Sequence, residues 1–228
     1  MSQSSENEEL TYIISHDLQE PIRMINSYVK LLEKKYGSAL DEEAKTYITY
    51  ALDGANKLKI MVDDLVNYSR LRKEKTRKIS FKVSDAIERA VKMVSKRYLD
   101  HDYEIEYNVT VFPEIVADKI QVIQLFLNII DNSIKFNLES QKKVSIITEK
   151  SGDYFKFCVS DNGIGIDRQY HDKIFRIFQK LHSQSEFPGS GIGLAICKKV
   201  VENHNGKIWI ESESGKGTKI FFTFPFLI

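Results

Sequence analysis

The sequence predicts an α plus α/β protein, in which a long antiparallel helical hairpin is followed by a sheet with helices packed on it. From about Glu8 to Leu71 the apolar residues recur at helical spacing, and the pattern is interrupted at Gly37. Beyond Ile79, strand-like runs alternate with helix-like segments, which indicates helices layered on a sheet. We therefore expect a helical domain at residues 1–75 and a mixed domain at 79–228.

The first helix carries its apolar side chains on one stripe: Ile14, Leu18, Ile25, Val29, Leu32 and Tyr36. A residue on a helix is turned by about 100° from its neighbour, so His16 lies about 160° away from both Ile14 and Leu18. We expect this imidazole to face water, with the carboxylate of Asp17 beside it as a hydrogen-bond or proton acceptor. A solvated histidine without a chemical role would have the same position.

The second helix is expected to begin after Gly37 and Ser38 close the first, because Asp41 and the acidic residues after it suit a first turn. Small and apolar residues alternate three and four apart along it, as in the seam of a bundle: Ala44, Ile48, Ala51, Ala55, Leu58, Val62 and Leu65. Two such helices alone leave much of their apolar surface exposed. A four-helix bundle of two hairpins, and hence a homodimer, is the simplest remedy.

Composition excludes several classes of partner. The 33 basic and 32 acidic residues give a formal net charge of +1, which provides no bulk field for nucleic acid or an anionic membrane. The longest apolar runs, such as 122–130, contain polar residues and are too short to span a bilayer, so no membrane segment and a cytoplasmic location are expected.

Cys158 and Cys197 lack the spacing of a metal or redox site, and we expect both to be buried thiols.

The mixed region is predicted to contain six strands and three helices. The strands are expected near 79–83, 103–109, 144–148, 154–160, 207–211 and 219–224. The helices are expected near 84–98, 118–136 and 193–204.

Three polar side chains share one face of the expected helix at 118–136. Asn128, Asn132 and Lys135 are spaced four and three apart, so two neutral oxygens and one cation point the same way. Such a face suits Mg²⁺ and the phosphates it bridges, because Mg²⁺ keeps several waters and takes few protein oxygens. The same residues also occur on ordinary polar helix faces.

Two glycine-rich segments follow. Asp161-Asn162-Gly163-Ile164-Gly165-Ile166 comes directly after a strand, so Asp161 presents a carboxylate at the strand end while the glycines let the chain turn. Gly189-Ser190-Gly191-Ile192-Gly193-Leu194 leads into a helix, whose first amides can bind phosphate. Taken singly, the first is most often a turn and the second a hinge. A dinucleotide fold is a poor competitor, because the second segment follows a polar loop and not a strand.

Taken together and in this order, downstream of a histidine on a helix, these motifs resemble those of a sensor histidine kinase of two-component signalling. The resemblance runs from about Leu10 to Phe226, and the runs SHDLQEP and IFRIFQKLH are similar to those of the phytochrome-like branch. It implies a dimerisation and phosphotransfer hairpin followed by an ATP-binding α/β sandwich of the gyrase, chaperone, histidine kinase and mismatch-repair type.

The resemblance also implies roles for individual residues. His16 becomes the phosphorylated residue and Asp17 its acid–base neighbour, while Asp161 reads the adenine amino group. The other implied contacts with Mg-ATP are Asn128 and Asn132 for the metal, Lys135 for phosphate, Gly163 and Gly165 beside the Asp161 that reads the adenine, and the lid residues Lys180, Gly189, Gly191, Gly193 and Leu194. Phe175 and Phe178 match the phenylalanine motif of the mobile lid. The implied partners are a second copy of the chain and the receiver domain of a response regulator, and a sensor domain is expected N-terminal to this portion in a longer protein.

One position departs from the family pattern. Many relatives carry threonine or asparagine four residues after the histidine, where a hydrolytic water is held, and this chain has Glu20. We therefore expect a kinase with weak phosphatase activity. An ATP hydrolase is disfavoured because Asn128 stands where such enzymes place a glutamate base, and an inactive scaffold would not need to keep all of these residues.

Overall fold

The computed structural model describes residues 3–73, 77–99, 102–108, 112–181, 187 and 189–226, with side chains in the two long helices from Asp17 to Leu71. The chain divides into two compact units. The first comprises residues 1–73 and the segment 188–192, and the second comprises 74–187 and 193–228.

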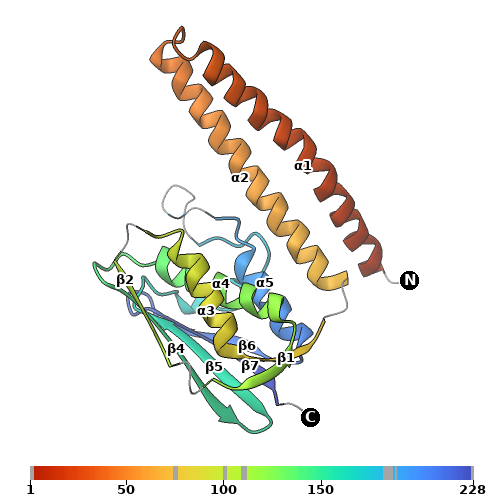
Figure 1. Cartoon of the computed structure of the whole chain (residues 1–228), viewed down its shortest axis with the longest axis vertical. Helices are drawn as coiled ribbons and strands as arrows, with labels where there is room; N and C mark the ends of the chain where they lie inside the picture. Colours follow the sequence, from red (N-terminus) through yellow and green to blue (C-terminus); the bar gives the residue numbers. More distant parts are fainter. Residues whose placement is uncertain are drawn as a thin grey trace. The chain divides into compact units, whose positions relative to one another are not determined.

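The first unit is the predicted helical hairpin (Figure 1). Helix α1 spans Gln3–Tyr36 and runs without interruption through Pro21, and helix α2 spans Glu42–Lys73. The side chain of Asp41 caps α2 by accepting a hydrogen bond from the amide of Ala44 at 2.7 Å, so the predicted helix start is confirmed.

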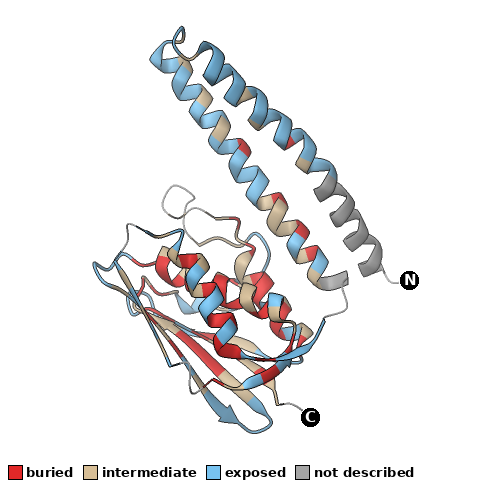
Figure 2. Ribbon diagram, viewed as in Figure 1, coloured by how far each residue is buried: buried red, intermediate tan, exposed pale blue. Residues whose placement is uncertain are grey.

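The core inside one hairpin is small. Ile22, Val62 and Val66 form its buried cluster, and Figure 2 shows most of the described surface of both helices as exposed. Helix α2 leaves much of the apolar stripe predicted for α1 uncovered. Four residues of that stripe keep between 40% and 49% of their surface exposed: Leu18, Ile25, Leu32 and Tyr36. Ile22, which stands four residues after Leu18 and three before Ile25 at the edge of that stripe, is buried.

The second unit contains a five-stranded sheet in the order β2-β4-β5-β7-β6 and a two-stranded sheet of β1 and β3. The strands of the larger sheet are β2 (Tyr103–Tyr107), β4 (Lys142–Ser151), β5 (Tyr154–Asp161), β6 (Ile208–Ser212) and β7 (Thr218–Pro225). Only the β2–β4 pair is parallel among these neighbours. Strand β1 (Ile79–Lys82) pairs antiparallel with β3 (Glu114–Ala117), a four-residue strand that the sequence patterns did not predict.

Three helices cover one face of the larger sheet: α3 (Val83–Ser95), α4 (Lys119–Lys135) and α5 (Gly193–Asn203) (Figure 1). A 3₁₀ turn, η1, spans Arg168–Tyr170. The core lies between the helices and the sheet, where Phe126 of α4 packs edge-on against Phe157 and Phe222 with ring centroids 6.2 and 5.5 Å away. The apolar face of α4 is therefore anchored to the sheet, which leaves its polar face for a ligand.

Two further expectations of the sequence can be compared with the fold. Cys158 and Cys197 are both buried free thiols, as predicted. Over the part of the chain that the structure describes, no helix is both long and apolar enough to cross a bilayer.

Candidate nucleotide-binding site

The polar face of α4 carries Asn128, Asn132 and Lys135, all three half-buried. Asn128 is held by hydrogen bonds at both ends of its amide, to the side chain of Gln124 and to the carbonyl of Gly193. The side-chain amide of Asn132 makes no hydrogen bond to the described residues, so its oxygen is available to a ligand. The ammonium group of Lys135 lies 4.4 Å from the centre of the Phe136 ring, at the C-terminal end of the helix.

Asp161 ends β5 and is fixed by its neighbours. Its Oδ1 atom accepts hydrogen bonds from the amides of Gly163 at 2.9 Å and Thr218 at 3.1 Å, and the hydroxyl of Ser133 also donates to the carboxylate. Burial raises the pKa of Asp161, and these three hydrogen bonds oppose that shift. The result is a half-buried acceptor that the protein itself holds in place.

The loop after Asp161 has no room for side chains at its two glycines. A Cβ atom on Gly163 would lie 2.5 Å from the carbonyl oxygen of Phe136, and the next amide, of Ile164, donates to that same oxygen at 3.0 Å. Gly165 has a φ of +67°, and its Cβ would lie 2.0 Å from the carbonyl oxygen of Glu213. The loop is therefore packed between the end of α4 and the β6–β7 turn, and the glycines are required by contact as well as by conformation.

Several residues that hold this loop were not assigned that role from the sequence. Thr218 faces Asp161 because β5 and β7 pair in that register, and Ser133 of α4 reaches the same carboxylate. Asn162 joins three segments: it accepts from Asn137 Nδ2 and from the amide of Lys143, each at 2.7 Å, and donates to the carbonyl of residue 141 at 3.0 Å. Ser133 could have been suspected from its place next to Asn132, whereas Thr218 needs the strand pairing.

The lid residues predicted from the sequence are only partly described. Phe175 and Lys180 are half-buried, and Phe178 is exposed with a φ of +60°, a left-handed conformation that is uncommon outside glycine. Residues 182–186 lie outside the described part of the chain. Gly189 and Gly191 belong to the segment grouped with the first unit, and Gly193 and Leu194 begin α5 in the second. Joint phosphate binding by these residues stays a prediction.

His16 lies in α1, but its side chain is outside the described residues. Asp17 is exposed on the next position. Four residues after the histidine, the Glu20 carboxylate lies 3.9 Å from the Arg23 guanidinium, and both side chains are exposed. Gln19 instead donates from Nε2 to Oδ1 of Asp63 at 3.0 Å, which ties this part of α1 to α2.

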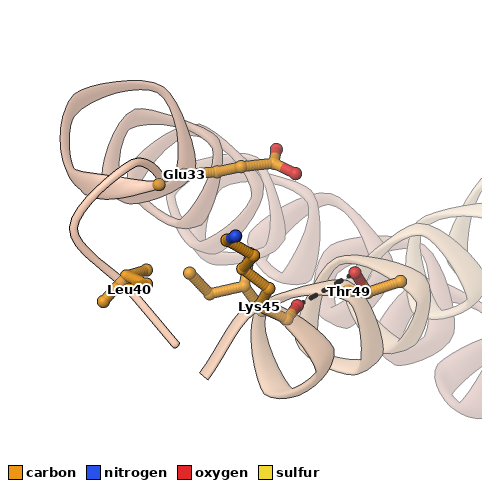
Figure 3. Close-up of a pocket in the computed structure, with 6 residues that line it drawn as sticks. Glu33, Leu40, Lys45 and Thr49 are labelled. Atoms are coloured by element: carbon orange, nitrogen blue, oxygen red, sulfur yellow. Dashed lines mark hydrogen bonds between the residues drawn. The ribbon is translucent and has the colours of Figure 1, made fainter. Parts of the chain in front are cut away.

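The hairpin also has a hollow at its closed end, near the loop between α1 and α2. Its volume is about 220 Å³, and Figure 3 shows Glu33, Leu40, Lys45 and Thr49 around it. None of the residues predicted to bind nucleotide lines this hollow, so it is not the candidate site.

Two family models match the chain in succession. The His Kinase A (phospho-acceptor) domain matches residues 6–74, which contain His16. The histidine kinase-, DNA gyrase B- and HSP90-like ATPase matches residues 117–228, which contain Asn128 and Asp161. The chain belongs to the histidine kinase family.

Curated relatives of this histidine kinase chain include phytochrome-like proteins of cyanobacteria. It is 41% identical over 214 residues to the phytochrome-like protein Cph1 of Synechocystis sp., covering 94% of this chain and 28% of that protein. It is 40% identical over 225 residues to cyanobacterial phytochrome A of Nostoc sp., covering 97% of this chain and 29% of the relative. The chain thus spans less than a third of the length of these relatives.

Solved structures show the same fold. Full-length ShkA in complex with AMPPNP aligns with a TM-score of 0.73 at 24% identity, over 96% of this chain and 46% of that one. The catalytic domain of the histidine kinase ThkA aligns with a TM-score of 0.54 at 26% identity, over 65% of this chain and 95% of that one. The predicted architecture of a helical hairpin followed by an ATP-binding sandwich is confirmed.

Proposed function

We propose that this chain is the kinase portion of a two-component sensor: a phosphotransferase that uses ATP to phosphorylate its own His16 and passes the group to an aspartate on a response regulator. The observation that carries the proposal is the fixed carboxylate of Asp161 beside a helix bearing Asn128 and Asn132. The chain that contains them also matches a phospho-acceptor domain around His16.

The residues present fit Mg-ATP. Asn128 and Asn132 supply neutral oxygens of the kind that Mg²⁺ accepts, and Asp161 supplies a half-buried acceptor suited to an adenine amino group. Bound Mg²⁺ would neutralise phosphate charge and orient the terminal phosphate. Lys135 and Lys180 add positive charge for the phosphates, and the amides at Gly193 and Leu194, with Gly189 and Gly191, form the phosphate-binding end of the lid.

The chemistry follows from these roles. An imidazole nitrogen of His16 attacks the γ-phosphorus of ATP, the bond from that phosphorus to the bridging oxygen breaks, and ADP leaves with the electron pair. Asp17 accepts the proton that the imidazole loses. A carboxylate oxygen of the regulator then attacks the same phosphorus and the P–N bond breaks. The protein contributes chiefly positioning and charge neutralisation.

The active form is a homodimer. Apolar side chains exposed along both helices of one hairpin are what a second hairpin would cover; they include Ile25, Leu32 and Leu58. A cytoplasmic location of this portion stays a prediction, as does the absence of a nucleic-acid partner.

Labelled ATP tests the function. Incubation of the full chain with γ-labelled ATP should place phosphate on His16, in a linkage that is labile in acid and stable in alkali. His16→Ala should abolish labelling while nucleotide binding, followed by a fluorescent ATP analogue, is unchanged.

The matched control is His101→Ala, since residue 101 lies outside both family matches, and it should label like the parent. Label on a serine, threonine or aspartate would overturn the proposal. Release of free phosphate without a labelled protein would instead indicate an ATP hydrolase, and a chain that neither binds nor consumes ATP would be a scaffold.

A further inference from the structure

The side chain of Asn128 is held by partners on two helices: Gln124 of α4, and Gly193 and Cys197 of α5. Gln124, one turn earlier on α4, donates from Nε2 to Oδ1 of Asn128 at 2.9 Å. At the other end, Nδ2 of Asn128 donates to the carbonyl oxygen of Gly193 at 3.2 Å. A carbonyl can only accept, so the nitrogen of Asn128 must face Gly193 and its oxygen must face Gln124.

The surroundings of Asn128 are closely packed. Gly193 is the first residue of α5, and a Cβ atom there would lie 3.8 Å from Cγ of Asn128. One turn further along α5, the thiol of Cys197 is fully buried and donates to the carbonyl of Leu125 at 3.8 Å. Asn128 thus lies where α4 packs against α5, and its side chain also hydrogen-bonds with the Cys197 thiol.

Rotation of the amide by half a turn would exchange its oxygen and nitrogen at little steric cost, because such terminal torsions are broad. That rotation would place Oδ1 opposite the Gly193 carbonyl, so that two acceptors face each other. The Gly193 carbonyl and the Gln124 donor together oppose this rotation. Oδ1 has two lone pairs, and Gln124 uses one of them, so the second remains for a metal ion.

We propose that Gln124 is a positioning residue, which fixes the amide of Asn128 so that its oxygen is presented to Mg²⁺ while its nitrogen holds the start of α5. This inference rests on the proposed function, because it takes Asn128 to be a metal contact of Mg-ATP. Hydrogen bonds to the groups that bind a metal orient them, and their loss typically lowers metal affinity about 10- to 100-fold.

The test compares nucleotide binding with and without Mg²⁺ in the full chain. Gln124→Met keeps the length of the side chain and removes the donor, and the position is half-buried, so an apolar side chain is tolerated. We expect metal-free ATP affinity to stay within about two-fold of the parent, and the gain in affinity on adding Mg²⁺ to fall about 10-fold or more. Gln124→Leu repeats the test if the methionine variant does not fold, as judged by its melting temperature.

Gln121→Met is the matched control. Gln121 lies on the same helix, is buried, and its Oε1 has no hydrogen-bond partner among the described residues. It makes no hydrogen bond to Asn128, so its substitution should leave the gain in affinity on adding Mg²⁺ unchanged.

A double variant separates positioning from general support of the helix. If Gln124 acts through Asn128, then Gln124→Met should have no further effect on the Mg²⁺-dependent gain in an Asn128→Ala background. Additive losses, or a normal gain in the single variant, would overturn the inference. A parent chain that binds no ATP would overturn the proposed function itself, which the same titration shows directly.

Discussion

The helical hairpin and the α/β unit bury their apolar residues in different ways. The α/β unit closes a core of its own, in which Phe126, Phe157 and Phe222 are fully buried. The hairpin has helices of 34 and 32 residues, yet its buried cluster consists of three aliphatic side chains. One part of the chain thus closes its core by itself, whereas the other leaves apolar side chains exposed that the proposed dimer would cover.

The largest effect is expected from a charge on the exposed face of α2. Leu58 belongs to the predicted bundle seam and is 44% exposed within one chain. Leu58→Asp would bury a carboxylate in an apolar dimer core at a cost of several kcal/mol. Light scattering at micromolar concentration should show a dimer for the parent and a monomer for the variant.

Ile60→Asp is the control for this change. Ile60 is 53% exposed and lies two residues from Leu58, hence on a different face of the helix. Its substitution should leave the dimer intact. If the parent chain were a stable monomer with fully formed helices, the hairpin would not need a second copy, and the proposed dimer would be wrong.

A smaller effect, confined to the α/β unit, is expected at Asp161. Asp161→Asn removes a charged acceptor worth about 1.5–3 kcal/mol, so ATP affinity should fall roughly ten- to hundred-fold. The asparagine oxygen can still accept from Gly163 and Thr218, and the substitution removes a half-buried charge. The melting temperature should therefore stay the same or rise, and calorimetry of binding and unfolding measures both. If Asp161→Asn bound ATP as tightly as the parent, Asp161 would not contact the nucleotide.

His204 gives the α/β unit a stability that depends on pH. Its ring accepts from the amide of Asp118 at 2.9 Å through Nε2 and lies 2.7 Å from the carbonyl of Val200 through Nδ1, a pattern that suits the neutral ring. Burial lowers the pKa of His204 below its ordinary value of 6.5. The folded state therefore binds this proton less readily than the unfolded state, so the stabilisation is complete above pH 6.5 and is lost as the pH falls through the lowered pKa.

Chemical unfolding followed between pH 5 and 7.5 should show this loss, of about 1 kcal/mol if one hydrogen bond is broken. His204→Gln should have lower stability at neutral pH and a flatter profile over the same range. An equally steep profile in the variant would assign the pH dependence to another group.

The smallest structural effect is expected on the hairpin surface at Glu20. Its exposed pairing with Arg23 contributes little to stability. Glu20→Thr should therefore leave the fold and autophosphorylation nearly unchanged, while decay of the purified phospho-regulator becomes faster because the repelling charge is gone. Fast decay with the parent, lost on substitution, would show that Glu20 supports hydrolysis.

Local patterns predicted the elements more closely than their contacts. The helix expected at 118–136 is α4, Lys119–Lys135, because its apolar periodicity and the Asp118 cap agree. Strand β3 was missed because four residues carry too short an alternation to detect. Periodicity also groups residues on one helix face without saying what covers it, which is why Leu18 and Ile25 are exposed inside one chain and Ile22 is buried.

The candidate site shows the same division. Asp161, Asn128 and Asn132 could be predicted because each stands in a local motif with a recognisable chemistry. Thr218 could not, because its contact with Asp161 depends on the pairing of β5 with β7 across 57 residues of sequence. Gln124 could not be predicted either, because the role proposed for it depends on its hydrogen bond to Oδ1 of Asn128.

The amides of Gly163 and Thr218, which grip one oxygen of Asp161, bear on the choice between purines. Because these two hydrogen bonds hold the Asp161 carboxylate in one orientation, it can only act as an acceptor toward the edge of a bound base. Adenine meets it with an amino hydrogen, whereas guanine carries a carbonyl oxygen at the same ring position and would be repelled. Preference for ATP over GTP would then come largely from a penalty on the wrong base. The backbone amides that hold the carboxylate in place would then set that penalty.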